Sequence, residues 1–151
     1  MAYLLQAFIC KSIDTDCLTK QFDKAIKVDI GQELSLIPMT EELFDQINEL
    51  EISESIDGFT YLTETVEKKI LLNIRERQFS YVEADYFGGQ GGQIAITWQD
   101  RKRQNIFSYG QGRINQVLKL FGVIANKGQD EFDTLGLGLH RETNDWLETQ
   151  K

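Results

Sequence analysis

Two acidic side chains, Glu83 and Asp85, stand two residues apart in a segment with the alternation of a β-strand, so both should project from the same side of that strand. Paired carboxylates can bind a metal ion or exchange protons during catalysis. Acidic residues are also common on a solvated strand face. Ala95, expected opposite Asp85, leaves room beside that carboxylate, which favours a contact surface.

His140 is the single histidine of the chain, and an imidazole can act as a general base when a carboxylate orients it. Several carboxylates lie near it in the sequence. The chain offers no second histidine for a zinc triad and no Gly-x-Ser-x-Gly nucleophile motif. We therefore predict no metal and no cofactor, and we assign no catalytic residue. His140, Glu83 and Asp85 are the candidates if the chain is an enzyme; otherwise His140 caps a helix or hydrogen-bonds at the surface.

A glycine-rich stretch, Gly88-Gly89-Gln90-Gly91-Gly92, follows the two carboxylates. Glycine permits positive φ and a close approach of backbones, but it costs conformational entropy. A hairpin needs one or two glycines, and this stretch has four. It is either a flexible turn without a binding role or a mobile loop that lets the backbone of a ligand or a partner come close.

The segments Phe79–Phe87 and Gln93–Gln99 are predicted as the two strands of a hairpin. If Phe87 lies opposite Gln93, six largely apolar side chains fall on one face, and the other, more polar face pairs Asp85 with Ala95, Glu83 with Thr97 and Tyr81 with Gln99. This register predicts a core-facing side and a solvated side. The core-facing side chains would be Val82, Ala84, Tyr86, Ile94, Ile96 and Trp98.

Further elements must position this hairpin. Tyr3–Cys10 is short and apolar, as in a buried strand. Thr40 and Thr63 are predicted helix N-caps, since each precedes acidic residues and an apolar stripe. The remaining expected elements are a helix capped by Asp14 or Thr15, strand character over Val28–Ile37 broken at Gly31, short strands at Phe59–Leu62 and Gln104–Tyr109, and a helix from Ile114 to Phe121 closed by Gly122. The pattern predicts one α+β domain over residues 1–151, with helices packed on a mainly antiparallel or mixed sheet.

The charge balance is acidic, with 16 Lys and Arg against 24 Asp and Glu and a net charge of −8. A negative surface repels phosphate backbones, so we expect no nucleic-acid partner. It suits association with a basic protein. No apolar stretch is long enough to span a membrane, so we expect no membrane partner. The N-terminal residues lack the features of a signal peptide. Cys10 and Cys17 have neither zinc nor redox spacing, so we expect reduced thiols and a cytoplasmic location.

Gly110-Gln111-Gly112-Arg113 precedes the Ile114 helix. A glycine turn, a helix N-terminus and an arginine can together hold an anion. A plain turn followed by a helix start explains the same residues.

Three segments taken together resemble a small family of uncharacterised bacterial proteins, some of which act as immunity-type partners of toxins. They are Tyr81–Gly89, Ile94–Trp98 and Asp130–Gly138, the last just before His140. The resemblance covers the C-terminal half most clearly. It implies a protein-binding role and carries no established active site.

We therefore expect a non-enzymatic protein-binding domain, specifically an immunity-like inhibitor of a bacterial toxin. Acidic inhibitors gain association rate against basic partners. Two alternatives remain: a small enzyme that uses the carboxylate pair and His140, or a structural or regulatory subunit that forms a homodimer through a sheet edge. The expected contact residues are Glu83, Asp85, Gly88, Gly89, Gln90, Gly91, Gly92, Asp130, Glu131 and Asp133.

Overall fold

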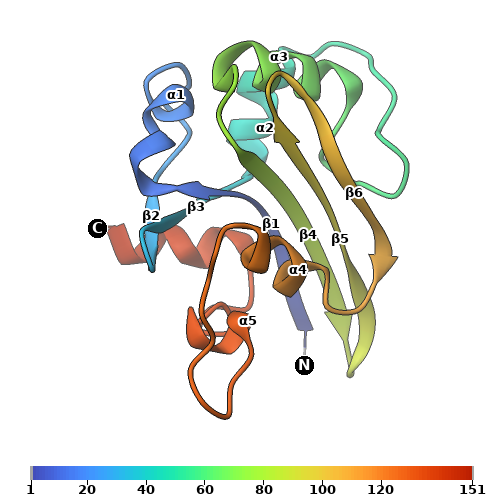
Figure 1. Ribbon diagram of the computed structural model, residues 1–151. Helices are drawn as coiled ribbons and strands as arrows, with labels where there is room; N and C mark the ends of the chain where they lie inside the picture. The colour runs from blue at the N-terminus through green and yellow to red at the C-terminus, as the bar shows by residue number, and fades with distance from the viewer. Residues whose placement is uncertain (1, 151) are drawn as a thin grey trace.

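The computed structural model describes residues 2–150 and is built around one six-stranded sheet (Figure 1). The strand order is β2-β3-β1-β4-β5-β6, and each neighbouring pair is antiparallel. The strands are β1 (Ala2–Lys11), β2 (Val28–Gly31), β3 (Leu34–Pro38), β4 (Phe79–Phe87), β5 (Gln90–Gln99) and β6 (Lys102–Gly110). Helices pack on this sheet, which confirms the predicted α+β fold.

The helices form two layers that are displaced along the strands (Figure 1). In that view α2 and α3 lie behind the upper end of the sheet, α4 lies in front of its lower half with α5 below it, and the C-terminal helix η2 lies beside β2 and β3. The helices are α1 (Asp16–Thr19), α2 (Glu41–Asn48), α3 (Glu64–Ile74), α4 (Arg113–Leu120) and α5 (Glu131–Thr134), with 3₁₀ helices η1 (Ser12–Asp14) and η2 (Thr143–Gln150). Across residues 2–150, no helix has the length and apolar character needed to cross a bilayer.

Both faces of the central strands are buried. One core gathers Phe8, Tyr81 and Trp98 with the apolar stripes of α2 and α3. The other gathers Ile9 and Val82 with the apolar side chains of α4 and the C-terminal segment. Alternating side chains of one strand therefore enter different cores. The prediction that one side of the β4–β5 hairpin is solvated is wrong over most of its length.

The hairpin register also differs from the prediction. Phe87 lies opposite Gln90, not Gln93, and Glu83 lies opposite Ile94. A shift of three residues is odd, so it reverses which side chains share a face. As a result Ile94, Ile96 and Trp98 share a face with Tyr81 and Glu83, whereas Val82 and Ala84 share the opposite face with Ala95.

Each glycine of the hairpin has a structural reason. Gly88 and Gly89 form a two-residue turn with φ of 60° and 80°, as a hairpin of this length requires. Gly91 and Gly92 lie inside β5. A Cβ at Gly91 would lie 1.8 Å from the carbonyl oxygen of Asp85, and a Cβ at Gly92 would lie 2.7 Å from the ring of Tyr109. The expected five-residue loop is therefore a two-residue turn followed by two close approaches.

The predicted helix starts at Thr40 and Thr63 are confirmed. Each side-chain oxygen accepts a hydrogen bond from the backbone N–H three residues later, at 3.1 Å. These bonds satisfy donors that the first helical turn leaves free. The predicted helix from Ile114 is also confirmed, and Gly122, with a φ of 84°, follows its end.

Two other predicted elements are shorter or absent. Thr15 has helical backbone angles and makes no capping bond, and the helix after it, α1, has only four residues. Phe59–Leu62 is not a strand; the nearest pairing is a single bridge between Ser55 and Thr63. The backbone N–H groups of Thr60 and Tyr61 in this segment donate to the carboxylate of Glu83 on β4 and not to a neighbouring strand.

Replacing Gly91 by alanine should destabilise the fold strongly. The new Cβ would overlap the backbone of β4 at a positive φ of 151°, so we expect a loss of about 3 kcal/mol or more. Gly128→Ala is the matched control, because its φ is +81° and no atom lies within 4 Å of the added Cβ; it should cost about 1–2 kcal/mol. Urea denaturation monitored by circular dichroism measures both. Equal losses would contradict the close packing at Gly91.

Candidate functional site

Glu83 is buried and fully engaged. Its carboxylate accepts hydrogen bonds from the backbone N–H groups of Thr60 and Tyr61, at 2.7 and 2.8 Å, and from the hydroxyl of Tyr81, at 2.7 Å. Only 7% of Glu83 is exposed. Burial, reinforced by the neighbouring carboxylate, raises the pKa of Tyr81 well above its usual value, so the phenol keeps its proton and remains a donor. Glu83 therefore fastens the segment before α3 to the sheet and is not open to a partner.

Asp85 lies one pleat beyond this fastening and is exposed. It points to the same side as Glu83, as predicted, but no helix or loop covers it. Its neighbours in the register are Leu4 on β1 and Gly92 on β5. The ring of Tyr109 from β6 packs over Gly92. A single row thus crosses four strands at the hairpin end of the sheet.

We define the uncovered sheet end as Leu4, Asp85, Phe87, Gly92 and Tyr109. Its large side chains are open to solvent, with 41% of Leu4, 76% of Phe87 and 57% of Tyr109 exposed. The surface combines apolar side chains, a glycine without a side chain and one carboxylate. That carboxylate, Asp85, forms no ion pair with any described residue. Contiguous exposed apolar side chains of this kind are typical of interaction sites.

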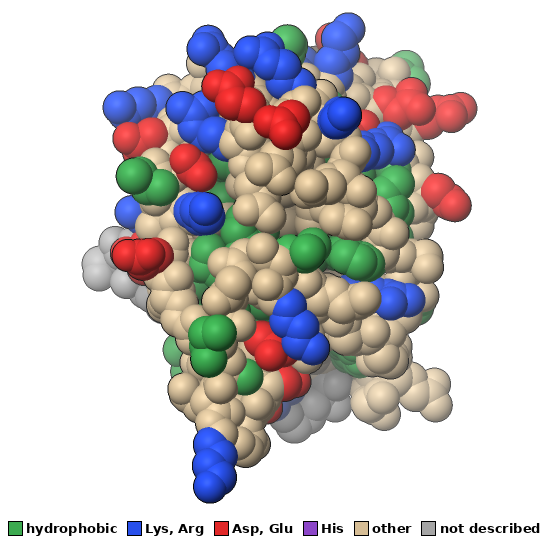
Figure 2. Space-filling model, in the orientation of Figure 1, with side chains coloured by type: hydrophobic (Ala, Val, Ile, Leu, Met, Phe, Trp, Pro, Cys, Tyr) green, Lys and Arg blue, Asp and Glu red, His purple; other side chains and the backbone are tan. Residues whose placement is uncertain are grey.

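The boundary of this surface is sharp. Ile94, in the row next to Asp85, is only 4% exposed. It lies under Gly58, where an added Cβ would be 2.5 Å from Ile94 Cδ1. The segment that precedes α3 therefore covers the row of Glu83 and Ile94 but not the next row, which contains Asp85. Figure 2, which shows the opposite side of the sheet, has charged side chains gathered at the α1 and α3 end and none at the tip of the β4–β5 hairpin.

His140 lies elsewhere. Its ring makes an edge contact with Trp146, with 4.7 Å between ring centroids, and Trp146 belongs to the core on the face opposite Glu83. His140 Nε2 is buried and has no hydrogen-bond partner among the described residues. The structure therefore does not bring His140 together with Glu83 or Asp85. No described residue supplies the orienting carboxylate that a general base requires, and residues 2–150 contain no group of three or more side chains able to hold a metal ion.

The acidic segment at α5 is mostly engaged in local structure. Asp130 caps α5 by accepting a hydrogen bond from the backbone N–H of Asp133 at 2.8 Å, and it accepts another from Asn115 Nδ2 at 3.0 Å. Glu131 Oε1 lies 4.0 Å from Lys119 Nζ and has a largely buried side chain. Asp133 remains exposed. Because α5 packs on the same core as Trp146, this segment does not adjoin Asp85.

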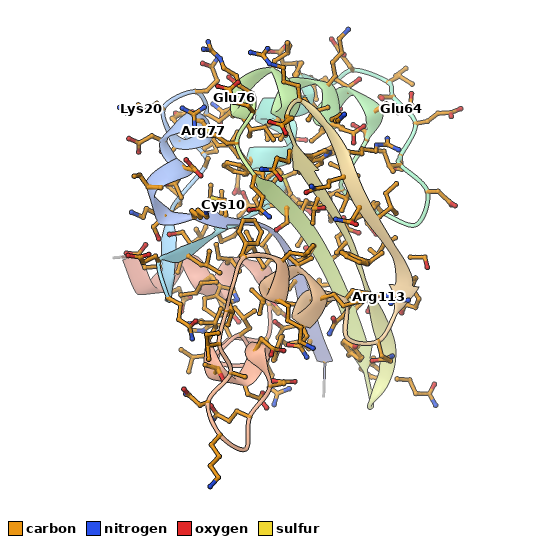
Figure 3. The ribbon with its side chains drawn as sticks, in the orientation of Figure 1. Cys10, Lys20, Glu64, Glu76, Arg77 and Arg113 are labelled. Carbon is orange, nitrogen blue, oxygen red and sulfur yellow. The ribbon has the colours of Figure 1, made fainter. Side chains whose placement is uncertain are left out.

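Asp130 also borders a cavity of about 450 Å³ between α4, the C-terminal segment and the hairpin. Of the two interpretations of Gly110–Arg113, the plain turn and helix start fits the hydrogen bonds at the start of α4. Arg113 donates to the carbonyl oxygen of Ser108 at 2.7 Å and to Gln116 Oε1 at 3.0 Å, and its side chain lies beside the end of β6 (Figure 3). The backbone N–H of Ile114 donates to Gln93 Oε1 at 2.8 Å, which uses the donor an anion would need.

Sequence reasoning placed Asp85 and the glycines at a contact surface but missed Leu4, Phe87 and Tyr109. The missing signal was the turn. A two-residue turn at the adjacent glycines Gly88 and Gly89 gives the observed register and places these three apolar side chains beside Asp85, but the sequence offers Gly91 and Gly92 as a second adjacent pair. No protein-family model, curated protein or solved structure matches this chain.

Glu83 and Asp85 provide a matched pair of substitutions. Glu83→Gln replaces a buried acceptor of three hydrogen bonds, so the free energy of unfolding should fall by about 2 kcal/mol or more. Asp85→Asn alters an exposed side chain and should change it by less than about 0.5 kcal/mol. Guanidinium titrations of both variants measure the difference. A Glu83→Gln protein as stable as the parent would remove the structural role of Glu83.

Asp130 predicts a pH dependence. The hydrogen bonds from Asp133 N–H and then Asn115 hold the pKa of this carboxyl below its usual value. A lowered folded-state pKa contributes stability above the unfolded pKa of about 3.9 and loses it as the pH falls through the folded value. Asp130→Ala should therefore cost about 1 kcal/mol at pH 7, and the difference should shrink below about pH 4. Thermal melts of both proteins across this range test it; a constant difference would contradict the assignment.

Proposed function

We propose that this chain is a non-enzymatic protein-binding domain that acts as an immunity-like inhibitor of a basic bacterial toxin. The observation that carries the proposal is the uncovered sheet end. The fold buries both faces of its central strands, yet at the hairpin end it leaves Leu4, Phe87 and Tyr109 exposed on one face. The carboxylate of Asp85, which forms no ion pair with a described residue, lies among them.

A protein fits this surface better than a small molecule. The row runs across four strands, and at Gly92, which has no side chain, the ring of Tyr109 lies over the backbone beside Asp85. Small-molecule sites are concave and surround their ligand. Protein interfaces instead join an apolar centre with a few polar groups, and aromatic residues such as Phe87 and Tyr109 are enriched there.

Charge favours a basic partner. The chain carries a net charge of −8, which accelerates encounter with a positively charged protein. Asp85 then offers an unpaired carboxylate to an arginine or lysine of the partner, inside an apolar surround that strengthens the bond once water is excluded. This combination suits an inhibitor that covers a toxin's basic active surface, and the resemblance of the hairpin segments to immunity-type proteins agrees with it.

The cysteines fit a cytoplasmic site of action. Cys10 and Cys17 are both free, and burial raises the pKa of each thiol. Thiols in this state react slowly, as suits a protein that works in a reducing compartment.

A second candidate function is a homodimeric structural or regulatory subunit. The observation that favours it is β6, a nine-residue strand that forms one edge of the sheet. Unpaired strand edges can join in a symmetric pair. Native mass spectrometry distinguishes the candidates: a mass of twice 17.4 kDa would favour the subunit.

Reversing the charge of the uncovered sheet end tests the main proposal. Against a basic toxin encoded beside this chain, Asp85→Lys should lower the association rate about 10-fold at low salt, and Phe87→Ala should raise the dissociation rate. The measurement is surface plasmon resonance, together with protection of cells that express the toxin.

Asp133→Lys is the matched control, because it makes the same charge change on an exposed side chain of α5. It should leave both rates near those of the parent. Toxicity that is unchanged by the parent chain, with no complex detected, would refute the inhibitor function. A larger effect of Asp133→Lys than of Asp85→Lys would move the contact to α5.

A further inference from the structure

The outer edge of β6 is open. β6 (Lys102–Gly110) pairs with β5 on one side, and within residues 2–150 no strand pairs with its other side. In Figure 1 it forms the right-hand margin of the sheet with no helix outside it. An edge of this kind presents backbone N–H and C=O groups that form a template for another strand, although the carbonyl oxygen of Ser108 already accepts a hydrogen bond from Arg113 Nε at 2.7 Å.

Proteins usually protect such edges with charges, prolines or very short strands. Here the charges lie at one end, at Lys102 and Arg103, and the pairing of β6 with β5 is irregular at two places, between Arg103 and Asn105 and between Phe107 and Gly110. Arg103 is moreover turned inward, where Nε and Nη2 each donate to the carboxylate of Glu67 at 2.7 Å. The remainder, from Gln104 to Tyr109, contains no charged residue and no proline. Ile106 is 51% exposed within it.

A groove runs beside this unprotected stretch. It has a volume of about 590 Å³. Its apolar lining includes Ile56, Ile94, Ile106 and Tyr109. Ile106 lies opposite Ile96 in the register, so it faces the α2–α3 side of the sheet, as does Tyr109. The groove therefore continues the uncovered sheet end along β6.

The rim of the groove is acidic. Asp57 and Glu64 both line it, both are exposed, and neither forms an ion pair with a described residue. Glu64 lies in the first turn of α3 and projects on the β6 side of the molecule (Figure 3). The groove thus offers an apolar floor with two carboxylates at its edge, of which Glu64 also acts electrostatically on Arg103 and, after the hydrogen bonds to Glu67, helps to raise the pKa of that guanidinium.

We propose that β6 binds an extended segment of a partner protein as an added antiparallel or parallel strand, with a large apolar side chain in the groove and a lysine or arginine beside Asp57 and Glu64. The inference rests on the proposed protein-binding function and names the form of the partner's contact. In strand addition, backbone hydrogen bonds supply affinity and alternate side chains supply specificity. The open edge and the one-sided groove match these two requirements.

A basic segment suits this edge better than a second copy of the chain. Two copies would bring together two molecules of charge −8. The one basic side chain of β6 that faces the groove, Arg103, is already held by Glu67, so a second copy has no free cation from that side to place beside Asp57 and Glu64. Charge complementarity therefore selects a basic segment of another protein.

The test uses the full chain and a displayed library of random heptapeptides. We expect enriched peptides in which a large apolar residue and a lysine or arginine occupy alternate positions. Ile106→Lys should weaken binding of these peptides at least 10-fold. Ile124→Lys is the matched control, because Ile124 is 75% exposed and lies outside the groove, and it should bind as the parent does. Hydrogen exchange of the β6 amides should slow when a selected peptide is bound.

Several results would overturn the inference: no enrichment, an acidic or non-alternating consensus, unchanged binding to Ile106→Lys, or a dimer of the parent chain that Ile106→Lys dissociates. If Ile106→Lys does not fold, peptides methylated on alternate backbone nitrogens replace it, and equal binding by both methylation patterns would overturn strand addition. With a whole partner protein, binding that is weakened by Asp85→Lys but not by Ile106→Lys would overturn strand addition and leave the proposed function standing. Binding that neither substitution weakens would overturn the proposed function as well.

Discussion

The buried carboxylate of Glu83 determines how far the helical layer extends over the sheet. It accepts hydrogen bonds from the backbone N–H groups of Thr60 and Tyr61 and a third from the hydroxyl of Tyr81. Without that anchor the segment before α3 would have no polar fastening to β4, and Ile94 would lose the cover that Gly58 gives it. The same anchor leaves the next row of the sheet open. The candidate contact surface is therefore a direct result of where one acidic side chain is satisfied.

The two helical layers explain why the open surface is small and localised. α2 and α3 cover one end of one face, whereas on the other face α4 packs beside β5 and β6, and η2 packs beside β1, β2 and β3 (Figure 1). Central side chains such as Phe8 and Ile9 are buried on opposite sides of the same strand. The hairpin end lacks cover on one face only, and there the chain keeps Leu4, Phe87 and Tyr109 in contact with water. Such exposure has an energetic cost of about 25 cal/mol for each Å² of apolar surface that a partner could bury.

Local signals in the sequence predicted local structure well. Thr40 and Thr63 were identified as caps because capping depends on residues within one turn. The α+β class followed from alternation and periodicity. The register did not, because four glycines within five residues allow several turn positions, and only the close approach of Gly91 to Asp85 selects one. The burial of Glu83 was equally hidden, since its backbone donors lie 22 and 23 residues away. Asp85 could be placed at the surface, whereas the apolar side chains around it required the register.

The first strand carries a consequence for how the molecule acquires its structure. β1 is an interior strand, yet its early residues are held by a distant segment: Tyr3 donates to the carbonyl oxygen of Leu137, the Leu4 N–H donates to that of Arg141, and the Gln6 N–H donates to the hydroxyl of Thr143. The partners of these three bonds are more than 130 residues apart in sequence. A chain emerging from the ribosome can form α2, α3 and the β4–β5 hairpin early, but it cannot complete its central strand until residues 137–143 have been synthesised. Contacts between residues this far apart in sequence slow folding, and both apolar faces of β1 stay incompletely covered until the distant segment reaches them.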